Sequence, residues 1–90
     1  MCRNIKPLFN FDPPTTDEEI RASAVQFVRK ISGFTHPSRA NAVAFDHAVD
    51  EVAAVATRLL AALETTAPPR DREVEAAKAK ARAALRYGQA

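Results

Sequence analysis

Cysteine, glycine and tryptophan are scarce in this sequence: it has one cysteine (Cys2), two glycines and no tryptophan. A lone cysteine excludes an internal disulfide and any zinc site built from paired cysteines. Two glycines are too few for a glycine-rich loop that cradles nucleotide phosphates. No apolar run approaches the roughly 18 residues of a membrane span, and residues 1–16 lack the apolar centre of a signal peptide. We therefore expect a cytoplasmic protein that does not associate with membranes.

Large apolar side chains are also few. Val, Ile, Leu and Phe together number 20 of the 90 residues, whereas alanine alone contributes 19. A chain of this length buries only about 60 to 65% of its unfolded surface, so a second subunit that covers more of it would add stability. The formal net charge of +2 is too small to indicate a partner by itself. These numbers favour a single small domain, residues 1–90, that self-associates.

The first sixteen residues contain three prolines and should form an arm with at most one helical turn. The arm also carries Ile5, Leu8, Phe9 and Phe11, and leaving these side chains in water would forgo about 1.5 to 3 kcal/mol each. We expect the arm to dock, with Leu8, Phe9 and Phe11 packed across the seam between the two helices that follow.

Three segments have helical signals. Thr16 and Glu19 have the spacing of a capping box, and apolar residues recur with helical period from there to Gly33. A longer segment after Ser38 has apolar residues in alternating steps of four and three. A third segment follows two prolines and begins with acidic residues. The sequence predicts an all-α, three-helix domain with a long central helix, its helices covering 17–32, 38–65 and 70–87.

Several separated segments resemble a known family: MCRNIK-x-LFNF at the start, then QFVRKISGF, PSRAN and TTAPPRDREVEAAKAKARAA. In this order and spacing they resemble domain of unknown function 2277, a small bacterial family. The resemblance implies a small all-helical bacterial protein and supplies no catalytic residues to transfer. It also implies that Cys2 and Arg3 belong to the domain.

Cys2 is the one residue that suggests an enzyme or a metal site. Removal of Met1 would leave a free α-amine beside the thiol, and Arg3 and Lys6 would favour the thiolate. The alternative is a small apolar residue packed under the arm, which is the commoner state of free cysteines and the one we favour. We favour a protein without enzyme activity, keep a thiol-dependent enzyme or metal site built on Cys2 as an alternative, and expect no cofactor.

A weaker metal-binding pattern lies in the central helix, where His47, Asp50 and Glu51 are spaced three and four residues apart. The ordinary interpretation is a solvated face with a His47–Glu51 pair. His36, in the preceding connector, could join His47 or Cys2 only if the fold brings them together.

Two basic groups suggest nucleic-acid binding as an alternative function. Lys78, Arg82 and Arg86 form a row on the last helix, and Arg29, Lys30 and Arg39 flank the first connector. Acids at the start and bases at the end of a helix also complement its dipole, which explains much of the first pattern without a ligand.

The function that we favour from the sequence is a helical interaction or assembly module without chemistry of its own. Its partner would be an unidentified protein or, most simply, a second copy in a two-fold dimer. The central helix is too long for the first helix to cover, and its apolar stripe is too wide for one partner. The predicted interface combines that stripe with the alanine face of the last helix: Val55, Leu59, Leu60, Leu63, Ala77, Ala81 and Ala84.

Overall fold

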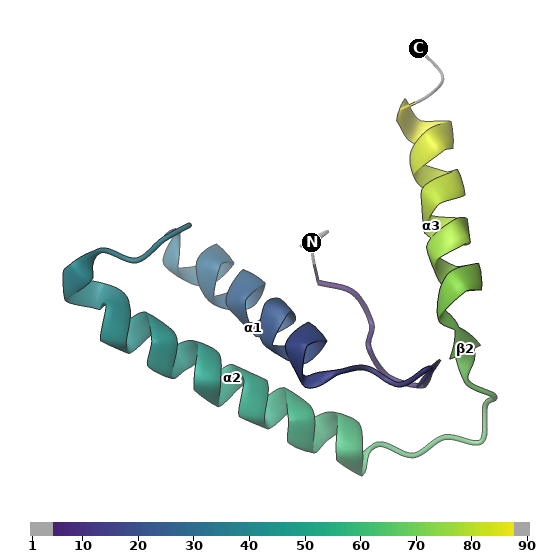
Figure 1. Cartoon of the computed structure of the whole chain (residues 1–90), viewed down its shortest axis with the longest axis horizontal. Helices are drawn as coiled ribbons and strands as arrows, with labels where there is room; N and C mark the ends of the chain where they lie inside the picture. Colours follow the sequence, from purple (N-terminus) through teal and green to yellow (C-terminus); the bar gives the residue numbers. More distant parts are fainter. Residues whose placement is uncertain (1–4, 88–90) are drawn as a thin grey trace.

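Two helices of this chain pack as an antiparallel hairpin, and a third stands apart from them (Figure 1). The computed structural model describes residues 5–87. The helices are α1 (Asp17–Ser32), α2 (Ala42–Ala62) and α3 (Arg72–Tyr87), with a 3-10 turn, η1 (Arg39–Asn41), before α2. Two short strands, β1 (Phe11–Asp12) and β2 (Arg70–Asp71), join the arm to the start of α3. The prediction of an all-α domain with a long helix is confirmed.

Local signals define both ends of α1. The Thr16 hydroxyl accepts a hydrogen bond from the Glu19 amide at 3.2 Å, and the Thr16 amide donates to the Glu19 carboxylate at 3.0 Å. This reciprocal pair is the predicted capping box. At the other end Gly33 has φ 78°, and its amide donates to the Arg29 carbonyl at 2.9 Å.

The core lies between α1 and α2. Ala24 and Val28 of α1 are buried against Val49 of α2, and Phe45 and Val52 pack around them. At 1.5 Å per residue, the 16 residues of α1 span about 24 Å and the 21 residues of α2 about 32 Å. The C-terminal end of α2 therefore extends past the helix that covers it.

The second helix differs at both ends from the range of 38–65 expected from the sequence. Ser38 does not cap it with its side chain, and Arg39–Asn41 forms a 3-10 turn before the α-helix begins at Ala42. Ala62 is its last residue because Leu63 adopts an extended backbone conformation with ψ 142°. The third helix begins at Arg72 rather than at residue 70, because Arg70–Asp71 forms β2.

The N-terminal arm docks beside the start of α3, a position that the sequence did not predict. β1 pairs in parallel with β2, with Phe11 opposite Arg70. Asn10 extends this contact: its side-chain amide donates to the Ala67 and Pro68 carbonyls, and its own carbonyl accepts from the Arg70 amide. We expected Leu8 and Phe11 to pack across the α1–α2 seam. Instead they line a groove between the arm and α3.

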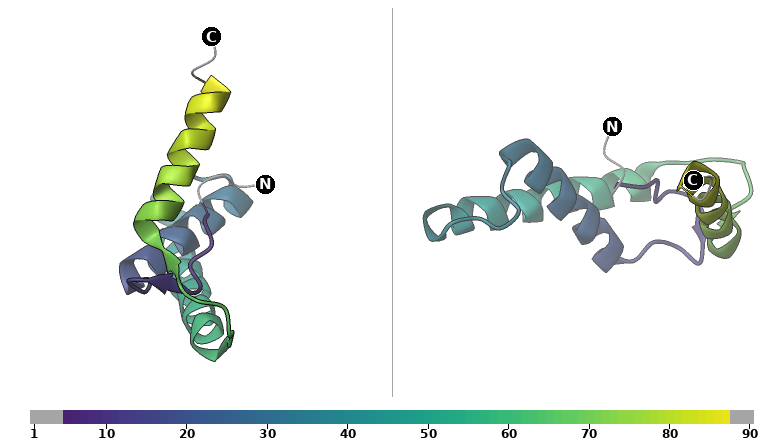
Figure 2. Two further views of the ribbon diagram at one scale, coloured as in Figure 1. Left: turned by 90° about the vertical axis from the view of Figure 1, so that its right-hand side faces the viewer. Right: turned by 90° about the horizontal axis from the view of Figure 1, so that it is seen from above.

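The molecule is flat, with extents of 42 × 41 × 18 Å (Figure 2). Its radius of gyration is 15.8 Å, whereas a compact chain of this length has about 12 Å. The difference arises because α3 points away from the hairpin instead of packing on it (Figure 1). No helix within residues 5–87 is both long and apolar enough to cross a membrane.

Candidate functional site

Arg72 joins the start of α3 to α1 and to the arm. Its Nη1 and Nη2 atoms donate to the two carboxylate oxygens of Glu19 at 2.8 and 2.7 Å. Its Nε atom donates to the Pro13 carbonyl of the arm. The guanidinium thus binds α1 and the arm at once, with the bidentate geometry that arginine forms with carboxylates.

Glu19 is strongly acidic in this setting. The hydrogen bonds from Arg72, followed by that from the Thr16 amide, lower the pKa of the Glu19 carboxyl from 4.5 to about 2. The same hydrogen bond raises the pKa of Arg72. Both groups are therefore charged throughout the physiological range.

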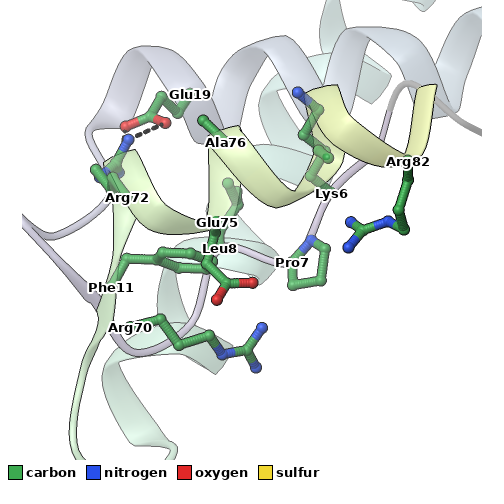
Figure 3. Close-up of a pocket in the computed structure, with 11 residues that line it drawn as sticks. Lys6, Pro7, Leu8, Phe11, Glu19, Arg70, Arg72, Glu75, Ala76 and Arg82 are labelled. Atoms are coloured by element: carbon green, nitrogen blue, oxygen red, sulfur yellow. Dashed lines mark hydrogen bonds and ion pairs between the residues drawn. The ribbon is translucent and has the colours of Figure 1, made fainter. Parts of the chain in front are cut away.

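A groove of about 510 Å³ lies between the arm and α3 (Figure 3). Its size is within the range of small-molecule sites. Its apolar wall comes from the arm on one side and from two alanines of α3 on the other: Pro7, Leu8, Phe11, Ala76 and Ala79. The Phe11 ring is covered by guanidinium groups, since those of Arg70 and Arg72 lie 5.2 and 5.9 Å from its centroid.

The groove carries more positive than negative side chains. Four basic residues line it, from the arm, β2 and α3, together with two acidic ones: Lys6, Arg70, Arg72, Arg82, Glu19 and Glu75. Arg72 is neutralised by Glu19, and Glu75 lies 3.4 Å from Lys78. Within residues 5–87, no carboxylate forms an ion pair with Lys6, Arg70 or Arg82.

A second surface feature is a row of exposed apolar side chains along α2. Val55 and Leu59 of α2 and Leu63, the residue that follows its last turn, are spaced at intervals of four residues and are 56, 54 and 43% exposed. Val52, which packs on the core, lies beside them, so the row is continuous with the α1–α2 core. We call Val55, Leu59 and Leu63 the α2 apolar row. Leu60 of the predicted interface is half-buried, and Ala77, Ala81 and Ala84 are exposed on α3.

The suggested metal ligands do not gather. His47 pairs with Glu51 on the exposed face of α2, whereas Asp50 is bonded to Arg21 at 2.7 Å. His36 is exposed in the connector before η1. In the described part of the chain, no group of three histidine, cysteine or acidic side chains could hold a metal ion. Cys2 lies outside the described residues, so the thiol hypothesis stays a prediction.

The two basic groups considered for nucleic-acid binding lie at opposite ends of the molecule. Arg29 and Lys30 lie in the last turn of α1 and Arg39 lies in η1, at the end of the hairpin that is far from α3 in Figure 1. On α3, Arg82 lines the groove and Lys78 is paired with Glu75. The six residues therefore form no continuous basic surface.

Residues 1–78 match the family described as an uncharacterized conserved protein, DUF2277. The chain belongs to this family. The match confirms the resemblance found in the sequence and includes the arm, both hairpin helices and the first part of α3. No curated protein and no solved structure shows a significant match to this DUF2277 chain.

Sequence reasoning on this DUF2277 protein found the capping role of Glu19 but missed its second partner. Arg72 follows Glu19 by 53 residues, and no local spacing relates the two. Sequence reasoning also missed three groove residues, Lys6, Pro7 and Arg70, because no local spacing relates the arm to β2. The one usable signal was the cluster of apolar and basic residues in the arm, which indicated a docked segment but not its docking place.

Proposed function

We propose that this protein is a helical assembly module that forms a two-fold dimer through the α2 apolar row. The observation that supports the proposal is the surface left exposed. The chain exposes 7211 Å², whereas a monomeric protein of 9.8 kDa typically exposes about 5,200 Å². Part of this excess of about 2,000 Å² comes from α3, which points away from the hairpin, and the α2 apolar row, 43–56% exposed, contributes to it on the hairpin itself.

A second copy is the occupant that fits the row best. Side chains at intervals of four form a straight ridge on a helix, and ridges of two identical helices can interdigitate around a two-fold axis. The row continues into the core through Val52. Burial of three branched apolar side chains against their copies would remove from water the part of α2 that α1 is too short to cover.

The exposed alanines of α3 could contribute to the same dimer. Ala77, Ala81 and Ala84 lie on the side of α3 opposite to the groove residues Ala76, Ala79 and Arg82, as helical spacing requires. Small side chains allow a neighbouring helix to approach closely. In the proposed dimer this alanine face supplies a close contact and the α2 apolar row supplies most of the buried area.

Light scattering of the full chain at micromolar concentration tests the proposal. We expect a mass near twice 9.8 kDa, and a single-chain mass in the Leu59→Glu variant with unchanged helicity by circular dichroism. Val43→Glu is the matched control, because Val43 is 83% exposed on the same helix but outside the row. A wild-type mass of one chain, or equal dissociation of both variants, would contradict the proposal.

A further inference from the structure

The groove between the arm and α3 has the features of a binding site for a small organic anion. Two segments that are far apart in the sequence meet there, the arm and the adjoining β2 and α3. The arm contributes the cation of Lys6, β2 that of Arg70 and α3 that of Arg82. None of the three forms an ion pair with a carboxylate of residues 5–87. In Figure 3 the Arg70 and Arg82 side chains extend toward the part of the groove that contains Pro7.

The charges of the groove select the kind of anion. Four basic and two acidic side chains leave a net charge of two positive units, and the Arg72–Glu19 pair is already satisfied internally. A phosphate monoester carries about 1.5 to 2 negative charges at neutral pH. It also offers three oxygen acceptors, which suits two guanidiniums and an ammonium group better than a carboxylate does.

The apolar wall selects an ester over free phosphate. Pro7 and Leu8 from the arm face Ala76 and Ala79 from α3 across the groove, and none of these side chains can hydrogen-bond to an ion. A ligand with a small apolar or aromatic body would displace water from this wall while its phosphate met the cations. We propose that the groove between the arm and α3 binds a small phosphate monoester with an apolar body.

Calorimetric titration of the full chain with phenyl phosphate tests this site. We expect saturable binding with one ligand per chain, and weaker binding of inorganic phosphate, which cannot use the apolar wall. Removal of one charged hydrogen-bond donor should weaken binding about tenfold, so Arg82→Ala and Lys6→Ala should each have this effect. Lys6→Ala is included because Lys6 is exposed and lies outside α3.

Lys80→Ala is the matched control. It removes the same charge from the same helix, two residues from Arg82, but Lys80 does not line the groove. We expect its affinity to stay within twofold of the wild type. Absence of saturable phenyl phosphate binding would overturn the proposal. An equal loss in Lys80→Ala and Arg82→Ala would also overturn it, because it would show general charge attraction instead of a site.

Discussion

Glu19 belongs both to the capping box of α1 and to the ion pair that joins α1 to α3. Its carboxylate accepts hydrogen bonds from Thr16 at the start of α1 and from Arg72 at the start of α3. The first bond closes a local turn, whereas the second fixes a segment 53 residues later in the chain. One side chain thus connects the end of the hairpin with the beginning of the helix that stands apart.

This double role predicts an acid-sensitive structure. Because the folded pKa of Glu19 is depressed to about 2, its stabilising effect is complete above pH 4.5 and is lost as the pH falls from 4.5 toward 2. In Glu19→Gln the amide oxygen can still accept from Thr16, but the ion pair with Arg72 is gone. We expect thermal unfolding midpoints of the wild type to decrease more steeply than those of Glu19→Gln between pH 4.5 and 2.

Thermal melts followed by circular dichroism at several pH values provide the measurement. The remaining carboxylates are the same in both proteins, so the difference between the two pH slopes reports on the Glu19–Arg72 pair. Parallel slopes would show that the pair contributes nothing to stability in solution.

At the scale of elements, the hairpin depends on very few buried side chains. Among the described residues only Ile20, Ala24, Val28 and Val49 form the buried core. Val49 has the largest fully buried side chain. A core of this size leaves little reserve, so each buried methyl group should have a measurable effect on the free energy of unfolding.

We predict that Val49→Ala lowers the free energy of unfolding by about 2 kcal/mol, because two buried methyl groups are lost and a cavity remains. Urea denaturation at a fixed protein concentration measures the change. Val43→Ala makes the same chemical change at an exposed position of the same helix and should stay within about 0.5 kcal/mol of the wild type. Comparable losses in the two variants would mean that Val49 is not the centre of the core.

The elements also show which features a sequence can predict. The bounds of α1 were predictable because Thr16, Glu19 and Gly33 act within a few residues of each helix end. The start of α2 was not predictable. Ser38 is of a residue type that often caps helices, but its side chain forms no capping hydrogen bond and a 3-10 turn follows it. The arm carried a clear apolar signal, but its pairing with β2 depends on Phe11 and Arg70, which only the fold brings together.

At the scale of the whole molecule, association and stability should be coupled. If the α2 apolar row is buried only in the dimer, dilution must destabilise the fold by mass action. We predict that the thermal midpoint rises with protein concentration in the wild type and is independent of concentration in Leu59→Glu. Calorimetry over a hundredfold range of concentration measures this, and a wild-type midpoint that does not change would speak against an obligate dimer.

The pairing of β1 with β2 has a consequence for the order of folding. It joins residues 11–12 to residues 70–71 and so closes a loop that contains the entire α1–α2 hairpin. The hairpin contacts connect nearby segments and can form first. Closure of so long a loop costs chain entropy, and only the few contacts between the arm and the start of α3 offset that cost. The arm and α3 should therefore attach last during folding and open first in the native state, exposing their amides to hydrogen exchange while the hairpin remains protected.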